Sequence, residues 1–202
     1  MEIRWGKERF VLSKRFHAHT LVALIVMHAA AALGVGLGLW WGMSLWFFLY
    51  LATGFAVLYL LSGFGITVGN HRFFVHKSFK APVPVSFAFA ILASMGCEQN
   101  IMKWGVPHVI HHWFADKPGD PHSPAVPEGS SFGKRLKAFG WAHMGWLISP
   151  YAYPHVIVER ARRELDSAAA RFSEKTHYIW AIAGFALPTL LAFPFWGWKG
   201  AL

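Results

Sequence analysis

Histidine is the residue type of this chain best suited to chemistry, because five of its twelve histidines fall in two short clusters. His71 and His76 form the first cluster, and His108, His111 and His112 form the second. Imidazole suits zinc, copper, iron and nickel, so the ligand type alone does not name the metal. A zinc hydrolase usually uses three protein ligands and keeps one position open, which is fewer ligands than these clusters offer. The sequence therefore predicts a site with more than one metal ion.

The spacing within each cluster indicates how its rings would point. On an α-helix, His108 and His112 lie about 40° apart with His111 on the flank, so these three imidazoles would enter one volume. His71 and His76 are five residues apart and would differ by about 140° around an α-helix. These two rings are therefore not expected to share a helix face, and they would reach different metals or flank one site.

The elements that must position these clusters are membrane helices. Residues 16–71 contain no Asp, Glu, Lys or Arg. As one helix this run would be about 84 Å long, whereas the hydrocarbon core of a bilayer is about 30 Å thick. We therefore expect two crossings, over residues 20–40 and 43–68, joined by a tight turn at Trp41-Gly42.

Two further apolar stretches complete the predicted fold. Residues 85–95 are too few to span a bilayer and predict an interfacial or re-entrant helix, whereas residues 177–198 predict a third crossing with a kink at Pro188. The fold class expected is an all-α integral membrane protein with a single domain. Its parts are an N-terminus (1–19), two transmembrane helices (20–68), a helical cap that carries the histidines (69–176) and the third transmembrane helix (177–198).

The positive charges predict the orientation of this fold. Of the nineteen Lys and Arg, thirteen lie in residues 70–176 and five lie in residues 1–15. The positive-inside bias places both segments on the cytoplasmic side, and the N-terminus is expected to be an uncleaved anchor. The net charge of +9 does not indicate nucleic-acid binding, because no basic run alternates with aromatic residues. A surface for anionic lipid or an acidic partner fits it better.

The order of these motifs resembles the membrane fatty-acid desaturases that include the stearoyl-CoA and bacterial Δ9 acyl desaturases. The matching motifs are HRxxxH over 71–76, HxxHH over 108–112, Asp120-Pro121-His122 and the segment 141–147, which contains His143-Met144-Gly145-Trp146. The resemblance covers residues from about 20 to 202 in order and spacing. It implies a mushroom-like fold, in which transmembrane helices lie below a cytoplasmic helical cap that holds two iron ions over a narrow acyl tunnel.

The resemblance also implies an activity and the residues that serve it. O2 and two electrons would remove two hydrogens from an unactivated methylene pair and leave a cis double bond. The implied iron ligands are His71, His76, His108, His111 and His112. Asp116 and Asp120 are expected to accept hydrogen bonds from ligand N–H groups, or else to be solvated loop carboxylates, and His122 is expected beside them as a structural hydrogen-bonding residue. The implied partners are an acyl substrate, an electron donor such as ferredoxin or cytochrome b5, and membrane lipid.

Two departures from the family pattern leave alternatives open. The family's third box, HNxHH, is absent, and no histidine follows His177, so five imidazoles would leave two irons incompletely coordinated. The sequence therefore predicts an incomplete enzyme that is inactive by itself; a non-catalytic remnant and a membrane di-iron hydroxylase are the alternatives. The acyl carrier is also open between CoA, a lipid and a carrier protein. Four basic residues would either bind CoA phosphates or form a basic membrane-facing surface: Lys103, Lys134, Arg135 and Lys137.

Overall fold

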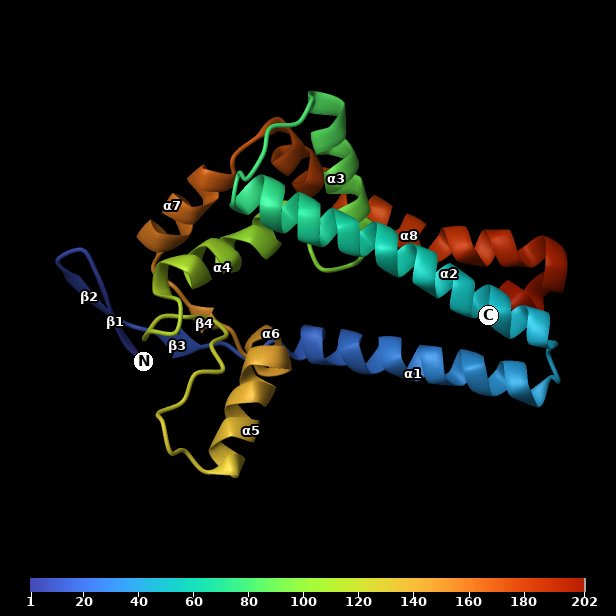
Figure 1. The fold of residues 1–202 in the computed structure, drawn as a ribbon, viewed down its shortest axis with the longest axis horizontal. Coiled ribbons are helices and arrows are strands. Elements are labelled where there is room, and N and C mark those ends of the chain that lie inside the picture. Colours follow the sequence, from blue (N-terminus) through green and yellow to red (C-terminus); the bar gives the residue numbers. More distant parts are fainter. Residues whose placement is uncertain (202) are drawn as a thin grey trace. The chain divides into compact units, whose positions relative to one another are not determined.

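The computed structural model describes residues 1–201, and helices dominate it (Figure 1). Contacts divide the chain into two compact units. The first consists of Met1–His28 and Val106–Arg163, and the second consists of Ala29–Gly105 and the residues from Glu164 onward. The boundaries between the units fall within three helices: α1 (Ala18–Trp40), α4 (Ile101–Phe114) and α7 (His155–Leu165).

Three helical segments are long and apolar enough to cross a membrane: Ala18–Trp40, Leu45–Val75 and Ala168–Gly200. In the most apolar 18-residue window of each segment, 6% of the residues are buried, so most of the apolar side chains are at least partly exposed. Water is a poor solvent for such a surface, whereas lipid suits a helix whose backbone hydrogen bonds are all internal. The predicted all-α membrane fold with three spanning helices is therefore confirmed.

In the second unit, the second span changes its helical pitch. It begins as the α-helix α2 (Leu45–Phe64) and continues as a π-helix, η1 (Gly65–Val75). The short apolar helix α3 (Val83–Met95) packs against η1, beside α8 (Ala168–Ala201) (Figure 1). A Cβ atom added at Gly65 would lie 2.4 Å from the backbone nitrogen of Ala93, and one added at Gly69 would lie 2.8 Å from Cβ of Phe89. The Gly-x-x-x-Gly spacing therefore permits the close approach of η1 and α3.

The turn between α1 and α2 lies where the sequence predicts it. α1 ends at Trp40, and Gly42 has a φ of +62°, which favours glycine. Tyr50 on α2 donates a hydrogen bond to the carbonyl oxygen of Pro188 on α8 at 2.6 Å. α8 keeps helical dihedral angles at Pro188, where a kink was expected, and the one non-helical residue within it is Gly197. The carbonyl oxygen of Pro188 thus accepts a hydrogen bond from the neighbouring helix α2.

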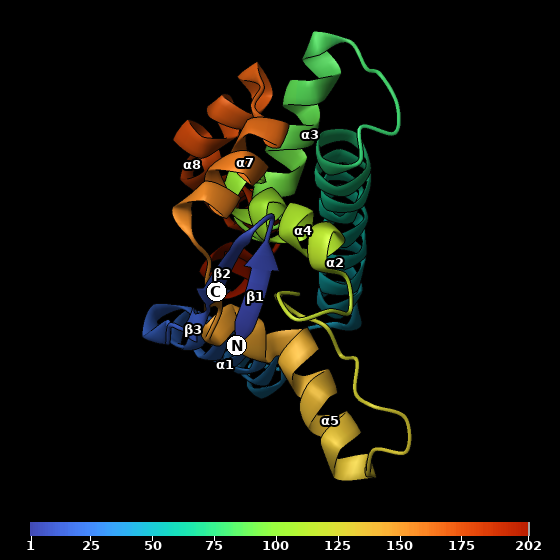
Figure 2. The same ribbon diagram turned by 90° about the vertical axis from the view of Figure 1, so that its left-hand side faces the viewer.

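In the first unit, short strands precede and follow the helices. β1 (Glu2–Trp5) and β2 (Glu8–Val11) form an antiparallel hairpin in which Ile3 faces Phe10 (Figure 2). The Trp5 ring lies 4.9 Å from that of Trp113 on α4, and the guanidinium of Arg160 lies 5.4 Å from Trp5. The sequence pattern does not predict these strands. An isolated hairpin is marginally stable, and this one is supported by ring contacts with residues that are distant in sequence.

A second strand pair ties the start of the first span to the rest of this unit. β3 (Ser13–Lys14) pairs with β4 (Tyr151–Ala152), and the Lys14 ammonium lies 3.3 Å from the centroid of the Trp141 ring. Three short helices directly precede β4 in the chain: α5 (Phe132–Gly140), the π-helix η2 (Trp141–Gly145) and α6 (Trp146–Ile148). The helix α7 (His155–Leu165) follows β4. Figure 2 shows α5 with the long loop that leads to it.

Candidate metal centre

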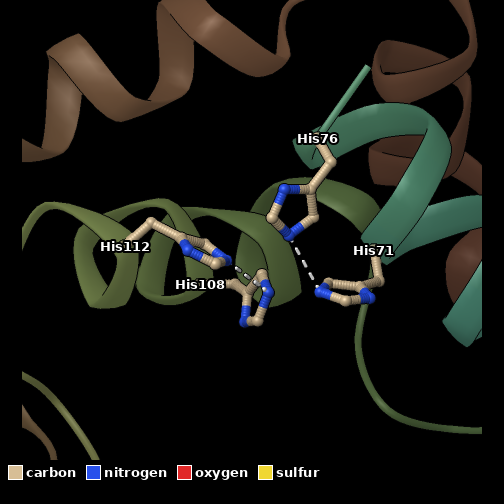
Figure 3. Close-up of side chains that lie close together, drawn as sticks. All are labelled: His71, His76, His108 and His112. Atoms are coloured by element: carbon tan, nitrogen blue, oxygen red, sulfur yellow. Dashed lines mark hydrogen bonds between the residues drawn. The ribbon is translucent and has the colours of Figure 1, made fainter. Parts of the chain in front are cut away.

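The first histidine pair lies at the end of the π-helix η1, where His71 is within the helix and His76 directly follows its last residue. A π-helix closes hydrogen bonds between residues five apart and has more residues per turn than an α-helix. At its end, the backbone N–H of His76 donates to the carbonyl oxygen of His71 at 2.9 Å. The wider turn brings both rings to one face, with their Nε2 atoms 2.9 Å apart (Figure 3). The expectation that these two histidines would not share a face is wrong, because it assumed α-helical pitch.

The second pair, His108 and His112, lies on the α-helix α4, as the sequence predicts. Residues four apart on an α-helix share a face, and the Nε2 atoms of these rings are 3.2 Å apart (Figure 3). The ring planes cross at 86° here and at 87° in the pair His71–His76. Two nitrogens that bind one metal at about 2.1 Å and at a right angle lie about 3 Å apart. Each pair therefore has the spacing of two ligands of one metal.

His111 contacts a different partner from its two neighbours on α4. Its Nδ1 lies 2.9 Å from Oδ1 of Asp120, whose side chain is 1% exposed. The centroid of its ring stands 5.8 Å from that of His108 and 5.4 Å from that of His112. Because the carboxylate accepts the Nδ1–H, the lone pair of His111 is on Nε2. This arrangement prepares Nε2 of His111 to bind a metal.

The carboxylate of Asp120 is held by several donors. The backbone N–H groups of Asp116 and His122 donate to its two oxygens at 2.9 and 3.0 Å. Burial by itself raises the pKa of Asp120, but the hydrogen bond from His111 and those from the backbone outweigh burial and hold the pKa below its usual range. Asp120 therefore stays ionised although its side chain is buried.

Asp116 takes part through its backbone. Its φ of +56° is unusual for a residue with a side chain, and it directs the backbone N–H to Asp120. Its carboxylate accepts a hydrogen bond from the hydroxyl of Ser123. Within the described residues no hydrogen bond joins this carboxylate to a histidine ring, so Asp116 does not accept from a ligand N–H as expected.

His122 lies flat against His111. Their ring centroids are 4.4 Å apart with an angle of 21° between the planes, and Trp146 covers His122 from 5.0 Å. Burial, then the neighbouring His111, lowers the pKa of His122, so its ring is neutral near pH 7. One ligand atom from each of His111, Asp120 and His122 lies within 4.8 Å of the others, which is a group able to hold a metal ion.

Two residues near the histidines escaped the sequence analysis. Tyr153 donates a hydrogen bond to the carbonyl oxygen of Gly119 at 2.6 Å, which fixes the loop next to Asp120. Burial, then the charge of Asp120, raises the pKa of Tyr153 well above its usual value. Trp104 places its ring 6.4 Å from that of His71 and donates from its indole nitrogen to Glu98 at 3.2 Å. No spacing rule signals either residue, because each contact joins segments that only the fold brings together.

The fold and the histidine pairs define a membrane protein with imidazole groups arranged as metal ligands. No family model matches the chain. Its relatives include a hex-5-enoyl-[acyl-carrier protein] acetylenase of Moorena producens (strain JHB), 34% identical over 72% of this chain and 45% of that protein. The Delta(9)-fatty-acid desaturase fat-6 of Caenorhabditis elegans is 31% identical, and stearoyl-CoA desaturase 5 of Bos taurus is 30% identical; each match covers 69% of this chain and 39% of the relative.

The chain therefore belongs to the fatty-acid desaturases, as its motifs indicated. It spans less than half the length of these relatives.

Proposed function

We propose that the protein containing this chain is an O2-dependent acyl desaturase with a histidine-held di-iron centre. The observation that carries the proposal is the pairing of ring nitrogens, 2.9 Å apart in His71–His76 and 3.2 Å apart in His108–His112, in a relative of desaturases. The reaction removes two hydrogens from adjacent methylenes, takes two electrons and two protons from outside, and forms two waters from O2. Because the chain spans only part of its relatives, the proposal concerns the complete protein.

The donor set fits iron. Both pairs offer imidazole nitrogens at the separation of neighbouring ligands, and imidazole is a ligand that iron accepts. Iron held there supplies the O2-dependent oxidation of an unactivated C–H bond, which no side chain performs by itself. The histidines of this chain would hold the ions. The hydrogen bonds around Asp120 would orient His111 and keep the Asp120 carboxylate ionised.

We further propose that each pair supplies two ligands to the di-iron centre. His71 and His76 lie at the end of η1, and His108 and His112 lie about one turn apart on α4. The spacing of the ring nitrogens within each pair supports this assignment.

His111 is assigned to a second metal, separate from the one that His108 and His112 hold. Its Nδ1 is hydrogen-bonded to Asp120, and its ring centroid lies 5.8 Å from that of His108 and 5.4 Å from that of His112, whereas those two are 4.7 Å apart. Asp120 fixes the tautomer of His111, and the flat contact with His122 restricts rotation of the ring. Asp120 and His122 thus act through His111, by holding its orientation.

The substrate proposed is an acyl chain, and its carrier decides the class of enzyme within the family. The relatives are named for different carriers: an acyl-carrier protein in Moorena producens and CoA in Bos taurus. We propose that ferredoxin or cytochrome b5 supplies the electrons, and that residues 1–19 and 69–176 lie on the cytoplasmic side, where these donors are found. The charge bias of the two segments supports this orientation.

The test is expression in a host that lacks desaturase activity, with a matched electron donor. Residues 1–202 would be expressed alone and joined to the coding sequence that follows, and both iron content and fatty-acid products would be measured. New cis double bonds that disappear in His76→Ala would support the proposal. Hydroxylated acyl chains would indicate the hydroxylase instead, and unchanged fatty acids from the complete protein with iron bound would contradict desaturation.

A further inference from the structure

The short helix α5 carries an apolar stripe that is open to the surroundings. Phe132 is 79% exposed, Leu136 is 56% exposed and Phe139 is 60% exposed. At about 100° per residue these three side chains fall within an arc of about 60°. Lys134 and Lys137 project from the opposite side of the same helix. No residue of α5 is buried.

Such a helix has little reason to be stable in water. Most of the stability of a helix in a protein comes from packing one of its faces against other elements, and α5 buries no residue. Within the described chain, the ring contact recorded for the stripe joins Phe139 to His143 at 5.7 Å, and this contact is local. Large exposed apolar side chains on one helix face mark a surface that something covers. The helix therefore requires an environment that accepts three apolar side chains and leaves two lysines in water.

The first unit itself places α5 near the start of a membrane span. α5 continues through η2 into α6, which ends at Ile148. The carbonyl oxygen of Ile148 accepts a hydrogen bond from the backbone N–H of His17 at 2.7 Å, and the span α1 begins at Ala18. The strand pair β3–β4 fastens the same junction. The helical rod that begins with α5 is thus fixed to the point where the chain enters the bilayer.

We propose that α5 is an interfacial helix that lies on anionic lipid. Phe132, Leu136 and Phe139 would enter the boundary between head groups and acyl chains, as the apolar face of a surface helix does. Lys134 and Lys137 would extend toward lipid phosphates, and α5 contains no acidic residue to oppose them. Charge complementarity and continuity with the span α1 both favour this occupant. The inference does not depend on the proposed enzyme activity.

A spin label at residue 136 tests this location directly. The label is attached to Leu136→Cys in a Cys97→Ser background, and a label at Glu128→Cys serves as the water-exposed reference. The full chain is reconstituted in phosphatidylcholine nanodiscs with and without phosphatidylglycerol. Collision rates with O2, which prefers lipid, and with a water-soluble nickel chelate then report the surroundings of the label without any turnover.

We expect the label at residue 136 to collide mainly with O2 when phosphatidylglycerol is present. Replacing both lysines, Lys134→Gln and Lys137→Gln, should lower the docking equilibrium constant roughly fivefold per lysine, which corresponds to about 1 kcal/mol each near an anionic surface. The matched control, Lys7→Gln with Lys117→Gln, removes two exposed cations elsewhere and should change nothing. Access of nickel in both lipids would overturn the proposal, as would shielding that ignores phosphatidylglycerol and the lysines. Shielding that appears only with an added acyl-carrier protein would overturn it in favour of a protein-docking surface.

Discussion

At the residue scale, the candidate centre depends on what holds each ring as much as on the ring itself. Asp120 combines a buried carboxylate with a ring N–H and two backbone N–H donors, so its charge and its position are both specified. A carboxylate that accepts from a ligand histidine raises the basicity of that ligand and fixes its orientation. His111 should therefore be the ligand most sensitive to a change outside the ligand set.

The substitution Asp120→Asn tests this dependence. An amide places an NH2 group where the backbone N–H of Asp116 or His122 now donates, and it no longer carries charge. We expect metal affinity at the second site to fall about 10–100-fold and stability to fall by about 1–3 kcal/mol. Iron per chain and the unfolding temperature measure the two effects. Asp116→Asn is the matched control, because that carboxylate accepts only from Ser123; equal metal loss in both variants would contradict the role of Asp120.

Removal of a ring tests the pairing on η1. His76→Ala takes away one of two nitrogens that lie 2.9 Å apart, so it should remove the metal that this pair holds. His108→Ala should likewise remove the metal that the pair His108–His112 holds. Metal analysis of chains purified from iron-supplemented cells measures both losses. His155→Ala removes an exposed histidine that belongs to neither cluster, and it should retain full metal.

The chemistry-bearing residues could largely be predicted from sequence, because ligand type and spacing are local properties. Asp120 has the hydrogen bond from a ring N–H that was expected, and Asp116 does not. The stacked position of His122 and the support from Tyr153 could not be predicted. Tyr153 reaches Gly119 across 34 residues, and only the folded loop brings the two together.

At the scale of elements, the approach of α3 to η1 is fixed by two glycines. A side chain at Gly65 would meet the backbone of Ala93, which cannot move aside as a flexible side chain can. We expect Gly65→Ala to cost about 1–3 kcal/mol of stability and to reduce metal content, because His71 lies on η1 and His76 caps its end. Unfolding in detergent and metal analysis measure these effects.

Gly63→Ala is the matched control for this prediction. Gly63 is two residues earlier on α2, and a Cβ atom there would meet nothing within 4 Å. Alanine is also the better helix former, so the control should be neutral or slightly more stable than the original chain. A loss of stability equal to that of Gly65→Ala would show that helix propensity, rather than packing on α3, sets the effect.

Helices and their ends were predicted with uneven success, for physical reasons. The apolar runs and the turn at Trp41-Gly42 could be found because burial in lipid demands a continuous apolar sequence. The π-helical pitch of η1 could not, since it depends on packing against α3 rather than on composition. The pair β3–β4 was missed because its two strands lie far apart in sequence. The hairpin β1–β2 joins neighbouring strands, but its Trp5 packs on Trp113, which is distant in sequence.

At the scale of the whole molecule, the distribution of positive charge predicts which side of the membrane each segment occupies. The charge bias predicts that residues 1–15 and 70–176 share one side and that the turn at residue 42 lies on the other. Single cysteines are placed at residues 42 and 130 in a Cys97→Ser background. The cysteine at residue 42 should react with an impermeant reagent in intact cells, and the one at residue 130 should react only after the membrane is opened. Labelling of residue 130 from outside would reverse the proposed orientation.

The π-helical pitch at the end of η1 should be stabilised by metal binding. In an ordinary α-helical winding, His71 and His76 would diverge by about 140°, and one ion would no longer reach both. An ion held by both rings therefore stabilises the wide winding over the narrow one, and the preference grows with metal concentration by mass action. Amide hydrogen exchange at residues 72–76 should slow when the ion binds. Slower exchange at these amides would then show that the last turn of η1 reports whether a metal ion is bound.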